Sequence, residues 1–130
     1  MTRANEISKQ FLEELDKHML ELKSGQAETS FEIGDIASLL HIHPTHLSNT
    51  IKATLKKSPC DIYEEKLVNV SKELIQTTPL SIAAIARQLT FDPSNFSKFF
   101  KHFEGITPKK FREAATLKRR PPEKVLNLSP

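Results

Sequence analysis

The chain has 130 residues, of which 38% are hydrophobic and 27% charged, a composition typical of one or two small globular domains. A single cysteine, Cys60, excludes an internal disulfide and a cysteine-rich zinc site, and no apolar run approaches the roughly 18 residues of a membrane span, so we expect a protein of the reducing cytoplasm. The net charge of +3 is unevenly distributed: it is −4 over residues 1–65 (7 Lys+Arg, 11 Asp+Glu) and +7 over residues 66–130 (12 Lys+Arg, 5 Asp+Glu). A basic half of this kind favours a polyanionic partner; the alternative is a basic surface that is merely solvated.

The first predicted helix covers residues 5–23. Apolar side chains recur there at helical spacing and form one stripe: Ile7, Phe11, Leu15, and Met19 or Leu22. Acids and lysines occupy the other positions, so the helix is amphipathic. Gly25 and the polar residues up to Ser30 end it. We therefore predict that residues 1–28 form an N-terminal amphipathic helix and a loop.

Two short helices joined by a tight turn are predicted for residues 29–58. The first helix spans about residues 33–40, and the turn comprises residues 41–43. Pro44 then opens a second helix to about residue 56, because proline is tolerated at the first helical position, where its missing N–H costs nothing. This pattern is typical of a helix-turn-helix unit.

A longer helix is predicted for the linker segment, residues 59–78. It begins at Pro59, with Ser58 as its N-cap, and ends near Gln76, before Thr77, Thr78 and Pro79. At about 1.5 Å per residue this helix is roughly 27 Å long. We therefore expect it to hold the segments on either side of it apart.

The segment 79–115 repeats the two-helix pattern and adds a closing helix. We predict a helix over residues 82–89, a turn over 90–92, a helix from Pro93 to about residue 103 and a closing helix from Pro108 to about residue 115. Asp92 and Thr107 precede these prolines and can act as N-caps. The last segment, residues 116–130, contains basic residues and three prolines, and it is predicted to be a disordered tail.

The two short-helix units are copies of one pattern, 49 positions apart and aligned without a gap. Ile33, Ile36, Ala37, Leu40, Ile42, Pro44, Leu47, Ser48, Ile51 and Lys52 recur as Ile82, Ile85, Ala86, Leu89, Phe91, Pro93, Phe96, Ser97, Phe100 and Lys101. The predicted buried faces of the two second helices are Leu47, Ile51 and Leu55 in the first copy and Phe96, Phe99, Phe100 and Phe103 in the second. We expect an all-α fold of about seven helices, with no strands, in which a long linker helix joins two helix-turn-helix subdomains.

The other face of each second helix carries small, polar or basic side chains. The second helix of a helix-turn-helix unit can enter the major groove of DNA, where such side chains contact base edges and phosphates. Two such faces in one register favour DNA binding. The alternative is a helical protein-interaction module that does not bind DNA and whose outward faces are solvated.

Two runs resemble a known family. The run IAAIARQLTFDPSNFSKFFKHFEGITPKKFR, residues 82–112, resembles the signature of the AraC/XylS family of bacterial transcription regulators, and IGDIASLLHIHPTHLSNTIK, residues 33–52, resembles that family's first helix-turn-helix. The resemblance covers roughly residues 30–114. It implies a cytoplasmic, sequence-specific DNA-binding transcription regulator that inserts two recognition helices into adjacent major grooves.

The resemblance also implies roles for individual residues. Those that fall where the recognition helices meet base edges are Thr45, Ser48, Asn49, Ser94, Asn95, Ser97 and Lys98. The candidates for phosphate contacts are His46, Lys52, Lys101 and Lys109. Arg112 is expected to make internal hydrogen bonds. Thr90 and Lys56 stand where the family usually has glycine, and the short spacing from Phe91 to Phe96 implies a second recognition helix that is rotated or starts later.

No catalytic, metal or cofactor site is predicted. His41, His43 and His46 lie across a turn with no accompanying cysteine or carboxylate ligands, and no order of Ser, His, Asp or Cys residues suggests catalysis. The expected partner is double-stranded DNA, with RNA polymerase as a further candidate and no membrane. We expect a monomer on DNA unless the chain is fused to a dimerisation domain, because family members usually carry a separate sensing or dimerisation domain.

Overall fold

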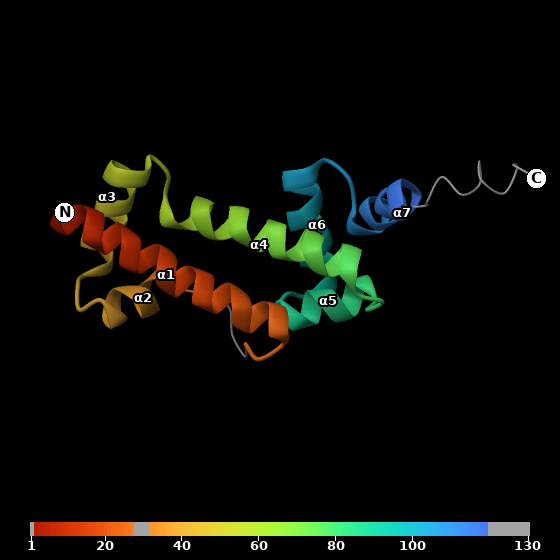
Figure 1. Ribbon diagram of the computed structural model, residues 1–130, viewed down its shortest axis with the longest axis horizontal. Coiled ribbons are helices and arrows are strands. Elements are labelled where there is room, and N and C mark those ends of the chain that lie inside the picture. The colour runs from red at the N-terminus through yellow and green to blue at the C-terminus, as the bar shows by residue number, and fades with distance from the viewer. Residues whose placement is uncertain (1, 28–31, 120–130) are drawn as a thin grey trace, which may run out of the picture.

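The computed structural model describes residues 2–27 and 32–119, which form seven α-helices and no strand (Figure 1). The helices are α1 (Arg3–Ser24), α2 (Ile33–Leu39), α3 (Pro44–Leu55), α4 (Pro59–Thr77), α5 (Ile82–Gln88), α6 (Pro93–Glu104) and α7 (Pro108–Arg119). The predicted all-α fold is confirmed. Each of the four predicted proline starts is the first residue of a helix.

The linker helix α4 is the axis of the molecule. α2 and α3 lie toward one end of it and α5, α6 and α7 toward the other (Figure 1), and α4 contacts helices of both groups. Its buried side chains lie along its whole length and include Ile62, Leu67, Leu74 and Ile75. We call α1–α3 the first unit and α5–α7 the second unit. A single helix therefore contributes to the cores of both units.

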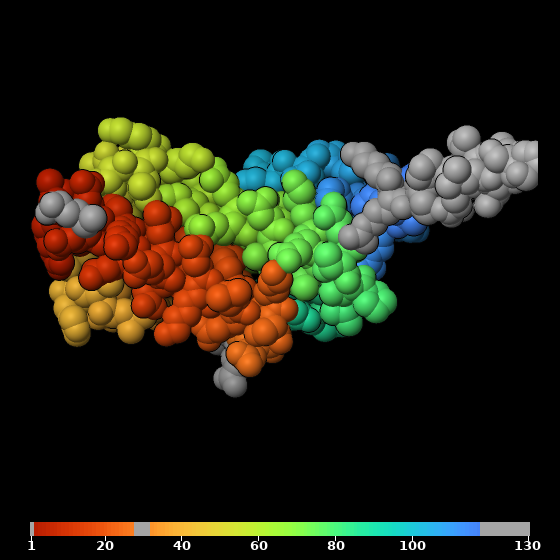
Figure 2. Space-filling model, viewed as in Figure 1, coloured from red at the N-terminus to blue at the C-terminus, as the bar shows by residue number. Residues whose placement is uncertain are grey.

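The N-terminal helix α1 packs on α3 and α4, and α1 and α4 make up much of the face shown in Figure 2. Its predicted apolar stripe is buried, with all five residues, Ile7, Phe11, Leu15, Met19 and Leu22, in the core. Each such side chain contributes about 1.5–3 kcal/mol when fully buried. Ser8 and Thr54 share a hydrogen bond between α1 and α3, and the ion pair of Lys66 with Asp16 (Nζ–Oδ1 2.6 Å) joins α4 to α1.

A polar contact also ties α1 to the second unit. The side-chain amide of Gln88, at the end of α5, donates hydrogen bonds to the main-chain oxygens of Leu22 (3.2 Å) and Lys23 (2.8 Å). The Leu22 oxygen also accepts from the Gly25 N–H (3.2 Å), so Gln88 adds a second donor there and supplies a donor to the Lys23 oxygen in the last turn of α1, where carbonyls lack the usual helical partner. The two units are thus held together by this contact as well as by α4.

The repeat extends to the backbone conformation. His41 (φ 57°) and Thr90 (φ 67°), 49 positions apart, both have positive φ in the turn before the second helix. Lys56 (φ 63°) and Gly105 (φ 81°), again 49 apart, both end that helix in the left-handed region. The predicted late start of the second recognition helix is wrong: α6 begins at Pro93, as α3 begins at Pro44. Phe96 and Phe100 are buried at the positions of Leu47 and Ile51 in the repeat, so α6 is not rotated relative to its copy α3.

Two further predictions are corrected. Phe103, predicted to be buried with Phe96 and Phe100, is 38% exposed, because it lies in the last turn of α6, where it packs on Phe99 (ring centroids 5.1 Å apart) rather than in the core. The closing helix α7 continues to Arg119, so residues 116–119 do not belong to a disordered tail. Alanine, leucine, lysine and arginine favour helix there, and the first proline comes only at Pro121. The rest of the predicted tail lies outside the described residues.

We expect the substitution Thr90→Gly to raise the free energy of unfolding by about 1 kcal/mol. A β-branched residue at positive φ is strained by about 1–2 kcal/mol. The buried Oγ1 of Thr90 also has no hydrogen-bond partner among the described residues, which adds to the cost. The greater entropy of glycine in the unfolded chain offsets about 0.5–1 kcal/mol of this gain. The thermal midpoint should rise by roughly 4 °C.

Thr90→Ser is the matched control for this prediction. Serine keeps both the strained backbone and the hydroxyl, so it should give no increase in the thermal midpoint. A Thr90→Gly variant no more stable than the parent would show that the turn is not strained.

Candidate nucleic-acid interface

The outward faces of α3 and α6 form the candidate interface. Figure 1 shows the two helices near opposite ends of α4, both running across it. Each buries an apolar face, with Leu47 and Ile51 in α3 and Phe96 and Phe100 in α6 all at 0% exposure. Leu55 and Phe99 are only partly buried. The same positions of the repeat thus anchor both helices, and the same positions face outward.

The predicted contact residues on these helices are accessible. Thr45, His46, Asn49 and Lys52 on α3 are exposed and Ser48 is half-buried; on α6, Ser94, Asn95, Lys98 and Lys101 are exposed and Ser97 is half-buried. Apart from Ser94, none of these side chains has a hydrogen bond or ion pair with another side chain in the described part of the protein. Side chains without internal partners can bind a ligand without first breaking contacts in the fold.

The N-terminus of each candidate recognition helix is capped. In α6, Asp92 accepts from the Ser94 N–H (3.2 Å), the role predicted for it. In α3, Nδ1 of His43 accepts from the Thr45 N–H (3.1 Å). The capping role of His43 was not predicted, although His43 aligns with Asp92 in the repeat, and that alignment was the available signal. Both helices therefore begin with a side-chain acceptor that fixes the first turn.

Ser94 has an internal partner as well as its predicted role. Its hydroxyl donates to the Asp92 carboxylate (2.6 Å). This hydrogen bond, followed by that from the Asn95 N–H, holds the pKa of Asp92 below its usual value, with smaller contributions from the Ser94 N–H and the charge of Arg87. Because its proton is committed to Asp92, Ser94 can offer an outside ligand an acceptor oxygen more readily than a donor.

The closing helix α7 adds one candidate contact and one structural residue. Lys109 is exposed in its first turn, where the Lys110 N–H donates to the N-cap Thr107 (Oγ1, 3.2 Å). Arg112 instead points inward: its guanidinium donates to the main-chain oxygens of Ile75, Thr78 and Leu80. The internal role implied for Arg112 is confirmed.

Residues 2–27 and 32–119 contain no group of three or more His, Cys, Asp or Glu side chains arranged to hold a metal ion. None of the described helices is both long and apolar enough to cross a membrane.

Known proteins share this sequence pattern and fold. Residues 36–114 match a family model described as a helix-turn-helix domain. The chain is 31% identical over 87 residues to the arabinose operon regulatory protein of Escherichia coli (strain K12). The aligned residues are 66% of this chain and 30% of that protein. It therefore spans about a third of the length of this relative.

Solved structures are similar over most of their own length. The C-terminal domain of AraT, a response regulator from Geobacillus stearothermophilus, superposes with a TM-score of 0.74 at 25% identity, over 87% of this chain and 88% of that one. A transcriptional regulator from Chromobacterium violaceum, described as AraC-type DNA-binding domain-containing, superposes with a TM-score of 0.67 at 24% identity. The superposition covers 88% of this chain and 96% of that one. The latter likeness concerns the fold.

Proposed function

The chain belongs to the AraC-type family of helix-turn-helix proteins, and we propose that it is a sequence-specific DNA-binding transcription regulator. In this proposal α3 and α6 enter adjacent major grooves of double-stranded DNA. One observation carries it: α3 and α6 have their caps, their buried anchors and their outward-facing residues at equivalent positions, 49 residues apart along the chain.

The length of α4 supports binding in successive grooves. Its 19 residues span about 28 Å at about 1.5 Å per residue. Successive major grooves on one face of B-DNA recur about every 34 Å. The length of the linker helix is thus comparable to the spacing of successive grooves. Binding of one recognition helix would raise the effective concentration of the other. This gain in affinity would compensate for the small number of basic side chains on α3.

The residue roles follow from chemistry and position. Thr45, Ser48, Asn49, Ser94, Asn95, Ser97 and Lys98 would contact base edges, and His46, Lys52, Lys101 and Lys109 would contact phosphates. The proposal includes no catalysis, since the named relative is a regulatory protein. It places the chain in the cytoplasm as a monomer on DNA, with RNA polymerase as a candidate partner.

A mobility-shift titration on mixed-sequence DNA at two salt concentrations tests DNA binding. With three or four phosphate contacts, we expect the logarithm of the association constant to fall with a slope of about −2.7 to −3.6 against the logarithm of salt concentration. Affinity should then drop roughly 40- to 150-fold between about 50 and about 200 mM salt. Absence of salt-sensitive binding would favour the alternative, a helical module that binds another protein through the same faces.

Selection of bound sites from random DNA tests sequence specificity. The expected result is an enriched site with two conserved blocks whose centres lie about 10 base pairs apart, one for each recognition helix. Enrichment of a single short block would mean that only one unit reads sequence.

A further inference from the structure

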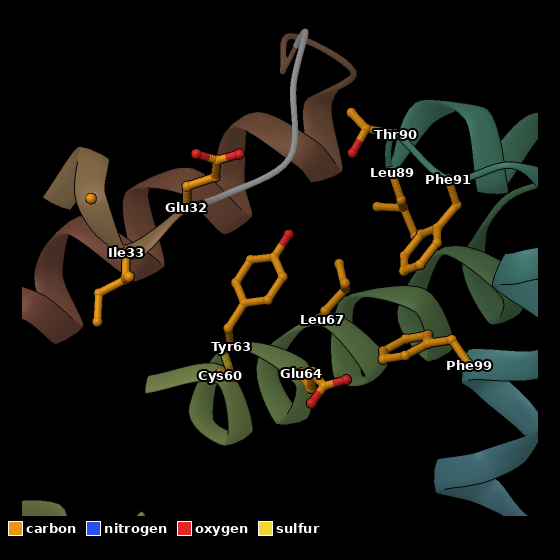
Figure 3. Close-up of a pocket in the computed structure, with 11 residues that line it drawn as sticks. Glu32, Ile33, Cys60, Tyr63, Glu64, Leu67, Leu89, Thr90, Phe91 and Phe99 are labelled. Carbon is orange, nitrogen blue, oxygen red and sulfur yellow. The ribbon is translucent and has the colours of Figure 1, made fainter. Parts of the chain in front are cut away.

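A cavity of about 710 Å³ lies between the two units, beside α4 (Figure 3). Glu32 at the start of α2 lines it from the first unit, Tyr63, Glu64 and Leu67 line it from α4, and Phe91 and Phe99 line it from the second unit. Pockets for small organic ligands typically have volumes of about 300–1,000 Å³. The cavity is therefore large enough for one such molecule.

The walls of the cavity are largely apolar and aromatic. Phe91 and Phe99 stack with ring centroids 5.1 Å apart, and Leu67 is only 2% exposed. Figure 3 shows these two rings together on the second-unit side, while the Tyr63 ring rises from α4 with its hydroxyl on the side of Glu32 and Thr90. The faces and edges of three aromatic rings thus border the same space, which suits a ligand with a flat or aliphatic apolar body.

The charges that line the cavity have one sign. Among the described residues that line it, Glu32 and Glu64 are the charged ones, and none is a lysine, arginine or histidine. Within residues 2–27 and 32–119, neither carboxylate is in an ion pair. Two uncompensated carboxylates beside aromatic rings attract a cation, because the faces of the rings also carry negative potential.

We propose that this cavity binds a small organic cation with an apolar body, of the arylalkylammonium class. Glu32 and Glu64 border the cavity on opposite sides of the Tyr63 ring (Figure 3), so the ammonium group would pair with one of them, and the apolar body would lie against Leu67, Phe91 and Phe99. Such a ligand would contact both units at once, in addition to the ties that α4 and Gln88 already provide. None of the lining residues is among the predicted DNA contacts, so the site is distinct from the candidate interface.

Calorimetric titration of the whole chain with 4-phenylbutylammonium tests the proposal. Two comparison ligands of nearly the same shape, neutral 4-phenylbutanol and anionic 4-phenylbutyrate, separate charge from apolar contact. We expect saturable binding of the cation at one site, about fivefold tighter than the alcohol and tighter still than the acid. Of the substitutions Glu32→Gln and Glu64→Gln, the one at the carboxylate that pairs with the ammonium group should weaken cation binding about threefold, and neither should change alcohol binding.

The control is Glu113→Gln, an exposed glutamate on α7 outside the cavity, which should leave cation binding unchanged. Equal affinity for all three ligands, an absence of saturable binding, or cation binding that neither glutamine substitution weakens would overturn the proposal. Because no DNA is present in this experiment, its outcome is independent of whether the chain binds DNA.

Discussion

Replacement of Arg112 by alanine is expected to lower the free energy of unfolding by about 3 kcal/mol. The Arg112 guanidinium donates to the main-chain oxygens of Ile75 (Nε, 3.1 Å), Thr78 (Nη2, 3.2 Å) and Leu80 (Nη1, 2.6 Å). Ile75 lies in the last turn of α4, where carbonyls lack partners within the helix, and Thr78 and Leu80 lie at the C-cap of α4 and in the loop that follows. A positive charge there also interacts favourably with the helix dipole. Urea denaturation followed by circular dichroism measures the loss.

Two variants identify the cause of this loss. Arg112→Lys keeps the charge but cannot place three donors in the planar arrangement of a guanidinium, so it should recover less than half of the stability. Arg87→Ala removes an exposed arginine of α5 and should change the free energy of unfolding by no more than about 0.5 kcal/mol. If Arg112→Ala were no more harmful than Arg87→Ala, the three hydrogen bonds would not hold α7 to the end of α4.

Local signals in the sequence were sufficient to predict the helices. Pro44, Pro59, Pro93 and Pro108 begin helices because their fixed φ suits the first turn, and Ser58, Asp92 and Thr107 cap them as expected. The 49-residue register then predicted which positions of α3 and α6 are buried, since equivalent residues in two copies of one unit meet equivalent neighbours.

Features that depend on contacts distant in sequence could not be predicted in this way. The hydrogen bonds from Gln88 to the end of α1 join residues 65 and 66 positions apart, and no periodicity indicates them. The exposure of Phe103 depends on how far the neighbouring helices reach along α6, not on its own spacing from Phe96. The cavity between the units likewise exists only after α2, α4 and α6 have assembled. The predicted base and phosphate contacts are accessible, and their roles remain predictions.

The second large effect is expected at Lys98 and Lys101 of α6. If α6 reads the major groove, Lys98→Ala should weaken binding to the selected site about 10-fold and relax the preference at one base position. Lys101→Ala, which removes a proposed phosphate contact, should weaken binding to all sequences alike and make the salt slope shallower by about one. Lys17→Ala, which removes an exposed lysine of α1 that is not a predicted DNA contact, is the control and should leave affinity within about twofold.

Asn49 extends this test to α3, because it occupies in the first unit the position that Lys98 occupies in the second. Asn49→Ala should relax a different base position, and it should leave the salt slope unchanged because an amide releases no counterions. The positions relaxed by Asn49→Ala and Lys98→Ala should lie about 10 base pairs apart, since equivalent residues on helices in successive grooves meet equivalent places one turn apart. A spacing unrelated to the helical repeat would mean that α3 and α6 do not enter successive grooves, even if both residues touch bases.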